Sequence, residues 1–253
     1  MLKIGWFSSG NGIGSVQLLS KVSQEIQDNN LNASIEFVFT NKDSDEGKGI
    51  ENYCKFVRSL NIPLINISSN KYKLNHPEKT FDNIRSLYDE KIITAIKPYK
   101  IDIIVMAGYM LFTDKKLCDQ FFMLNLHPAP PNGPHGTWQK VIEDLIYNKY
   151  VFAGAQIQIA TINRDQGPIL SYCTFPIDKD ELYKKLWANL NKHSNISSSE
   201  LFQQIRSDML KREPYLLVET LNSLVNKEII LTRNENLNYI CLNEKIEKHL
   251  ATN

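Results

Sequence analysis

A run of apolar, mainly β-branched residues over positions 101–108 limits the folds open to this chain more than any other segment. It predicts a strand that is buried on both faces, as in the parallel sheets of α/β proteins. A second short strand is expected over residues 122–126. Because side chains alternate between the two faces of a strand, Asn125 and His127 should point the same way, while the leucines on either side of Asn125 anchor the strand in apolar surroundings.

Prolines follow this second strand and should end it. They stop the strand and stiffen the chain that leaves it: Pro128, Pro130, Pro131 and Pro134. In open α/β sheets, ligands bind beyond the carboxyl ends of the strands. We place a third polar group there, Asp165, from a later loop that ends in Gly167-Pro168. The sequence thus predicts an amide, an imidazole and a carboxylate at one edge of the sheet, although residue type and spacing alone leave a purely structural role for each of them open.

Near the N-terminus, a predicted strand over residues 2–8 leads into a glycine-rich turn and then a helix with apolar residues at helical spacing. Glycines let the backbone approach a ligand closely, and the N–H groups at a helix N-terminus attract anions. A phosphate cradle is therefore one interpretation, and a plain tight turn is the other. The spacing of the glycines differs from the G-x-G-x-x-G pattern of dinucleotide sites. The residues that would form the cradle are Gly10, Asn11, Gly12, Ile13, Gly14 and Ser15.

Strand and helix patterns alternate along the first 178 residues. This order predicts a single α/β domain with a Rossmann-like, mostly parallel sheet and helices on both faces, its last two strands antiparallel because their connection is short. Residues 179–253 are expected to form a C-terminal extension of helices and a β-hairpin. Further strands are predicted at 34–40, 63–67, 151–161 and 169–177, helices at 48–60, 81–96, 138–148 and 181–187, a polar insertion at 69–78, a long helical pattern at 199–226 broken near Pro214, and hairpin arms at 228–232 and 238–242.

Charge and composition exclude several classes of function. Lys+Arg 29 balance Asp+Glu 28, and the resulting net charge of +1 supplies no global field to attract nucleic acid or an anionic membrane. No apolar run reaches the roughly 18 residues of a membrane helix, and the N-terminus lacks the pattern of a signal peptide, so we expect a cytoplasmic protein. The cysteines have no C-x-x-C spacing, which predicts reduced thiols and neither a zinc site nor a disulfide framework. They are Cys54, Cys118, Cys173 and Cys241.

Three segments give the chain a resemblance to a known family. The segment Asn125-Leu126-His127-Pro128 with a downstream Asp165-x-Gly167-Pro168, preceded by Met106-Ala107-Gly108-Tyr109-Met110, resembles the folate-dependent formyltransferases. The resemblance runs from residue 1 to about residue 177 and is strongest to the members that formylate glycinamide ribonucleotide. It implies a transferase of purine biosynthesis that moves a formyl group from the co-substrate 10-formyltetrahydrofolate to a primary amine.

The resemblance also implies roles for individual residues. An amine that attacks a formyl carbon needs donors for the developing oxyanion, a proton acceptor and an oriented imidazole. We assign Asn125 as the oxyanion donor, His127 as the group that moves protons, and Asp165 as the group that orients His127. The glycine-rich turn would hold a phosphate of the small-molecule amine substrate. Folate contacts are expected from Ala107, Tyr109, Met110, Leu111, Phe112, Thr161 and Gly167.

Departures from the family pattern leave the acceptor open. Gln158 stands where a histidine is usual, Ala129 where a serine is usual, and Leu111 where an arginine is common. An amino sugar on a nucleotide is the alternative acceptor, and a non-catalytic folate- or nucleotide-binding protein is the alternative from another class. His127 and His135 are eight residues apart with no nearby cysteine or paired carboxylates, so no metal site is expected. The C-terminal extension could cover the site, bind a partner or form a homodimer.

Overall fold

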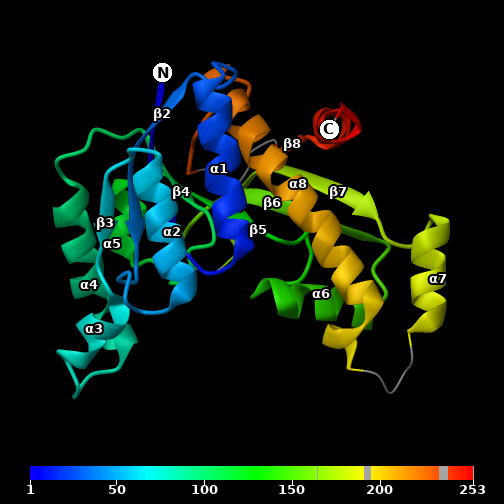
Figure 1. The fold of residues 1–253 in the computed structure, drawn as a ribbon, viewed down its shortest axis with the longest axis horizontal. Helices are drawn as coiled ribbons and strands as arrows, with labels where there is room; N and C mark the ends of the chain where they lie inside the picture. Colours follow the sequence, from blue (N-terminus) through cyan, green and yellow to red (C-terminus); the bar gives the residue numbers. More distant parts are fainter. Residues whose placement is uncertain (164, 191–194, 234–238, 253) are drawn as a thin grey trace.

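A computed structural model of the chain describes residues 1–163, 165–190, 195–233 and 239–252 (Figure 1). The described strands are β1 (Leu2–Ser8), β2 (Ala33–Thr40), β3 (Leu64–Asn66), β4 (Ile103–Met106), β5 (Met123–His127), β6 (Phe152–Ile159), β7 (Ile169–Pro176) and β8 (Ile240–Cys241). The described helices are α1 (Ile13–Gln27), α2 (Lys48–Ser59), α3 (Ser69–Leu74), α4 (Phe81–Ile96), α5 (Lys115–Gln120), α6 (Trp138–Tyr147), α7 (Glu181–Asn189), α8 (Glu200–Val225) and α9 (Asn243–Thr252), with a 3-10 turn, η1, at Ile196–Ser198. Across these ranges, no helix combines the length and hydropathy of a membrane span.

The described strands form one eight-stranded sheet in the order β3-β2-β1-β4-β5-β6-β7-β8. The first five strands in this order are parallel, β6 is antiparallel to both of its neighbours, and β8 runs parallel to β7. The predicted α/β fold with a mostly parallel sheet is confirmed, and so is the antiparallel pairing of β6 and β7. Strand β4 is shorter than its apolar run, and all of its residues are buried, as a central strand requires.

Helices cover both faces of the sheet (Figure 1). On one face, apolar residues of α1, α2, α8 and α9 pack against the strands, and Trp6 and Val105 belong to this core. On the other face, α4, which contributes Tyr88, and α5 pack against an aromatic layer that contains Phe7 and Phe39. Capping side chains explain where several helices begin, because Thr80 and Thr137 each accept a hydrogen bond from the first turn of α4 and α6.

The order of the strands places a crevice at one edge of the sheet. From β1 the chain continues outward to β2 and β3, and it then returns to the other side of β1 to form β4 and β5. At such a reversal, the loops after the two central strands diverge and leave room for a ligand. The glycine-rich turn follows β1, and the segment that begins at Ala107 follows β4, so two of the predicted binding segments meet at this point.

Helix α8 is continuous, and the predicted break near Pro214 is wrong. Proline removes one helical hydrogen bond and crowds the preceding turn, at a cost of about 3 kcal/mol. The next turns bury Leu216, Leu217 and Leu221 completely. Because each buried leucine contributes about 1.5–3 kcal/mol, their packing outweighs the proline. Helix α8 therefore lies along the sheet beside α1 (Figure 1). The expected domain boundary after residue 178 stays a prediction.

One further local prediction differs from the structure. The predicted C-terminal hairpin does not form among the described residues, because 228–233 carry no strand and β8 pairs with β7 instead; residues 234–238, which would make its turn, lie outside the described residues. Strand β8 thus pairs with the open edge of the sheet at β7, and not with the other predicted hairpin arm. The polar insertion predicted at 69–78 contains α3, whose N-terminus is capped by the Ser68 side chain.

Candidate active site

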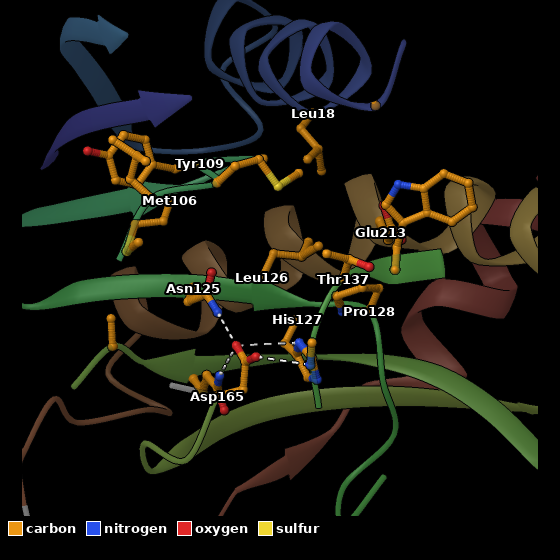
Figure 2. A pocket seen from close by; sticks show the side chains of 18 of the residues that line it. Leu18, Met106, Tyr109, Asn125, Leu126, His127, Pro128, Thr137, Asp165 and Glu213 are labelled. Atoms are coloured by element: carbon orange, nitrogen blue, oxygen red, sulfur yellow. Dashed lines mark hydrogen bonds and ion pairs between the residues drawn. The ribbon is translucent and has the colours of Figure 1, made fainter. Parts of the chain in front are cut away.

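A cavity of about 770 Å³ opens beyond the carboxyl ends of β1, β4 and β5 (Figure 2). Its walls come from the glycine-rich turn, the segment after β4, the proline-rich segment after β5, the loop between β6 and β7, and one side of α8. Such a volume is typical of small-molecule sites, and the lining is mostly apolar with a few polar groups. The cavity therefore lies where the strand order predicts a ligand-binding site.

Strand β5 presents the predicted amide and imidazole on one face. Asn125 lies opposite Gln158 of β6, and His127 lies opposite Gln156, so four polar side chains share that face. His127 is only 2% exposed, and Gln158 is equally buried. The Gln156 side chain donates to the Oε1 atom of Gln158 at 3.4 Å. The position at which the family resemblance implies a histidine is thus a glutamine in a buried row of amides.

Asp165 joins this row from the loop between β6 and β7. Its Oδ1 atom accepts hydrogen bonds from the Asn125 amide at 3.3 Å and from the Gln158 amide at 3.5 Å, and its Oδ2 atom accepts one from the Gly136 N–H at 3.3 Å. The backbone of Asp165 has a φ of 52°, a left-handed conformation that aspartate tolerates better than most residues. The structure therefore brings the three side chains predicted from the sequence together, as Figure 2 shows.

Two groups flank the imidazole of His127. Its Nε2 atom is 3.0 Å from the Pro134 carbonyl oxygen, and its Nδ1 atom is 3.6 Å from Oδ1 of Asp165. A carbonyl oxygen only accepts hydrogen bonds, so the proton of the neutral ring lies on Nε2 and the lone pair on Nδ1 faces the carboxylate. Burial lowers the pKa of His127, and the nearby negative charge of Asp165 opposes that shift. At neutral pH the imidazole is therefore uncharged, and its orientation is set by a backbone carbonyl that the sequence did not indicate.

The glycine-rich turn forms one end of the cavity. Five of its six predicted residues line the cavity; Gly10 does not, because it packs beneath the turn against Ile50 and Tyr53. Helix α1 begins directly after Gly12, and no side chain in the described part of the protein caps it. Its first N–H groups are therefore free to bind an anion.

The segment after β4 forms an apolar wall of the cavity. Tyr109, Met110, Leu111 and Phe112 line the cavity, together with Thr161 and Gly167 from the loop between β6 and β7. Ala107 is the exception among the residues predicted to contact folate, since it is fully buried in the core. The Ser9 hydroxyl accepts a hydrogen bond from the Met110 N–H at 2.9 Å, which ties this wall to the end of β1.

Helix α8 contributes three residues that the sequence analysis missed. Arg206, Leu210 and Glu213 line the cavity, and Arg206 Nη1 donates to Glu213 Oε1 at 2.8 Å. The guanidinium also stacks on the Trp138 ring at 4.6 Å and lies with Nη2 3.7 Å from where a Cβ on Gly14 would be. Their spacing of i, i+4 and i+7 predicts that they share one side of a helix. The sequence does not indicate which part of the protein that side faces.

Comparisons with known proteins agree with this architecture. Residues 3–199 match the model of a family described as formyl transferase. No curated protein sequence matches the chain significantly.

Solved structures show the same fold at low sequence identity. Glycinamide ribonucleotide transformylase 1 from Symbiobacterium toebii aligns with a TM-score of 0.68 and 16% identity, over 92% of this chain and 91% of that one. Phosphoribosylglycinamide formyltransferase from Bacillus halodurans aligns at 0.63 and 20%, over 89% and 96%. A formyltetrahydrofolate deformylase from Pseudomonas syringae aligns at 0.65 and 15%, over 92% of this chain and 64% of that one. At these identities the structural likeness speaks for the fold, and the family model speaks for the family.

Proposed function

The chain belongs to the formyl transferase family, and we propose that it moves a formyl group from 10-formyltetrahydrofolate to the primary amine of glycinamide ribonucleotide, a step of purine biosynthesis. One observation carries this proposal. The cluster of Asn125, His127 and Asp165 lies in a single cavity between an uncapped helix N-terminus and an apolar wall. A phosphorylated amine can enter from the first side and a pterin ring from the second, so that their reacting atoms meet at the cluster.

Asn125 would stabilise the oxyanion of the tetrahedral intermediate. Its amide nitrogen carries two N–H donors, and the contact with Asp165 at 3.3 Å uses one of them. The other donor is available to an oxygen in the cavity, whose lining includes Asn125. A preorganised donor of this kind typically lowers the barrier by about 2.7–4 kcal/mol.

His127 would move the proton that the amine loses. After the amine nitrogen bonds to the formyl carbon, it carries a positive charge, and its proton must leave before the C–N bond to the folate breaks. The lone pair on His127 Nδ1 can accept that proton, because Nε2 is already protonated and bound to the Pro134 carbonyl. The Asp165 carboxylate, 3.6 Å away, stabilises the imidazolium that forms. The imidazolium can then give this proton to the departing folate nitrogen.

The acceptor would be recognised through its phosphate. The free N–H groups at the start of α1 and the Arg206 guanidinium face the same end of the cavity. Glu213 is 3% exposed and holds one edge of that guanidinium, which fixes the position of the other edge. A phosphate between the helix N-terminus and the guanidinium would receive charge-assisted hydrogen bonds from both.

An assay with purified protein tests the function directly. We expect formyl transfer from 10-formyltetrahydrofolate when glycinamide ribonucleotide is supplied, and none when glycinamide without the ribose phosphate is supplied. Transfer only to an amino-sugar nucleotide would replace the acceptor and keep the chemistry. Release of formate without any amine would identify a deformylase, and consumption of no formyl-folate under any of these conditions would contradict the proposal.

The phosphate site makes a prediction of its own. Inorganic phosphate should stabilise the protein, because a ligand that binds only the folded state at ten times its Kd adds about 1.4 kcal/mol to the free energy of unfolding. For a chain of this size, that gain raises Tm by about 3–6 °C. Arg206→Gln should remove most of the shift. Arg212→Gln is the matched control, since Arg212 lies on the same helix and pairs with Glu247 away from the cavity. An equal shift in both variants would place the phosphate elsewhere.

A further inference from the structure

We infer that His127, His135 and Asp165 together form a binding site for a divalent transition-metal ion of the zinc class. Each residue offers one ligand atom, and the three atoms lie within 4.8 Å of one another. No third ligand is close to His127 and His135 in the sequence. The Asp165 carboxylate comes from a distant loop, which the fold places beside His127.

The first argument is the state of the ligand atoms. Nε2 of His127 is engaged by the Pro134 carbonyl and carries the proton, so Nδ1 presents a lone pair toward Oδ1 of Asp165 at 3.6 Å. Neither atom has a proton to share with the other while the imidazole is neutral. Two acceptors that face each other, one buried and one partly buried, favour a cation between them, and His135 adds a third ligand from the cavity side.

The second argument is the support around the ligands. A metal-binding histidine usually donates its other N–H to a carbonyl or carboxylate, which fixes the ring, and His127 does so at 3.0 Å. The Asp165 carboxylate is itself held by hydrogen bonds from Asn125, Gln158 and the Gly136 backbone. Two of the three ligands are therefore already oriented before an ion arrives.

The third ligand can close the remaining distance. Around an ion at about 2.0–2.1 Å from each ligand, neighbouring ligand atoms of a tetrahedral site stand roughly 3.3 Å apart. The His135 side chain is exposed, and its ring stacks loosely on His127 with 6.2 Å between the ring centroids. A rotation of His135 is thus enough to contract the cluster without moving the strand.

The ligand set also indicates which ion binds. Two imidazoles and one carboxylate suit zinc and the neighbouring transition metals, while magnesium and calcium prefer oxygen ligands alone. A second group of possible ligands in the described part of the chain consists of carboxylates alone: Asp43, Asp45 and Glu46. It is also occupied by a cation of the protein, because Lys71 Nζ lies 2.9 Å from Asp43 and 3.0 Å from Asp45.

A consequence follows for transfer, and it rests on the proposed function. A metal ion at this site takes the lone pair of His127 and the charge of Asp165, the two features that would serve the amine. The bound ion therefore competes with the amine substrate, and zinc acts as an inhibitor rather than as a cofactor.

Titration of the metal-free protein with Co²⁺ tests the site without any activity assay. We expect saturable binding of one ion with the visible absorption of low-symmetry Co²⁺, and excess Mg²⁺ should not displace that signal. His135→Ala should weaken binding at least tenfold while thermal unfolding confirms that this surface variant folds. Asp45→Asn, which disrupts the other cluster, should bind as the wild type does. Unchanged affinity in His135→Ala, or a loss confined to Asp45→Asn, would overturn the inference.

Inhibition is measured separately, with each variant compared with its own metal-free rate. Zinc should inhibit the wild type at concentrations at which it spares His135→Ala. Equal inhibition of both proteins refutes the competition. If Co²⁺ binds as expected and no acceptor is formylated, the proposed function fails while the metal site stands.

Discussion

Replacement of His127 by alanine is expected to lower kcat by roughly 10²–10⁴, the range that a positioned general base contributes. The imidazole is buried against the cavity and its free lone pair faces Asp165. Among the described residues that line the cavity, the other imidazole belongs to the exposed His135. The variant should still fold, because the main structural loss is one hydrogen bond to the Pro134 carbonyl, worth about 1–3 kcal/mol. Turnover and thermal unfolding are measured on the same preparations.

Two companion variants separate catalysis from stability. His127→Gln keeps a side-chain N–H that can reach the carbonyl but has no basic nitrogen, so it should be as inactive as alanine and more stable. His76→Ala is the matched control, because this histidine bonds to Tyr72 on the far side of the fold and lines no part of the cavity. If the chain only binds its ligands and does not catalyse transfer, none of the three substitutions changes a rate. Ligand affinity then stays close to that of the wild type.

The pH dependence gives a second readout of the same residue. Burial moves the pKa of His127 below its usual 6.5, since the charged ring is poorly solvated. The neutral ring is the active form, so kcat/KM should rise with pH along a limb below 6.5 and stay flat from there to neutral pH. Asp165 favours the protonated ring, so Asp165→Asn should move the limb to still lower pH. A limb above 6.5, or one that Asp165→Asn leaves in place, would be inconsistent with His127 as the base.

Replacement of Gly167 by alanine should have the largest effect on the fold of the site. A Cβ at this position would lie 1.7 Å from the backbone oxygen of Ile159, a contact that only a shift of the chain can relieve. The same place holds the hydrogen bond from the Ile159 N–H to the Pro168 carbonyl at 2.9 Å. The loop must move away from β6 and carry Asp165 with it. We expect a loss of about 3 kcal/mol in the free energy of unfolding, at the upper end of overpacking effects, and loss of turnover.

Gly49→Ala is the matched control for this substitution. Gly49 lies in the first turns of α2, and its added Cβ would meet the Gly10 oxygen at an ordinary 3.6 Å. Alanine favours the helix over glycine by about 0.5–1 kcal/mol, so this variant should be as stable as the wild type or slightly more stable. Chemical denaturation and steady-state rates measure both effects. If Gly167→Ala unfolds like Gly49→Ala and stays active, the close packing of the loop on β6 is refuted.

Local patterns in the sequence were sufficient for the framework of the protein. The apolar run at 101–108 predicts a buried strand because only apolar residues can fill a position with no solvent on either face, and β4 is buried throughout. The alternation of side chains places Asn125 and His127 on one face, which is a geometric property of any strand. Capping residues such as Thr137 set the start of a helix through contacts within one turn. Each of these inferences depends only on near neighbours along the chain.

Contacts between distant segments needed the tertiary structure. Asp165 meets Asn125 across 40 positions of sequence, and the fold adds Gly136 as a donor to the same carboxylate. The Pro134 carbonyl that orients His127 has no side-chain signature at all, since every residue carries a backbone carbonyl. Arg206 and Glu213 face the cavity because leucines further along α8 anchor that helix on the sheet. Residue type and spacing fix what each segment can become, whereas the packing of whole segments, summed over many weak contacts, fixes which of them become neighbours.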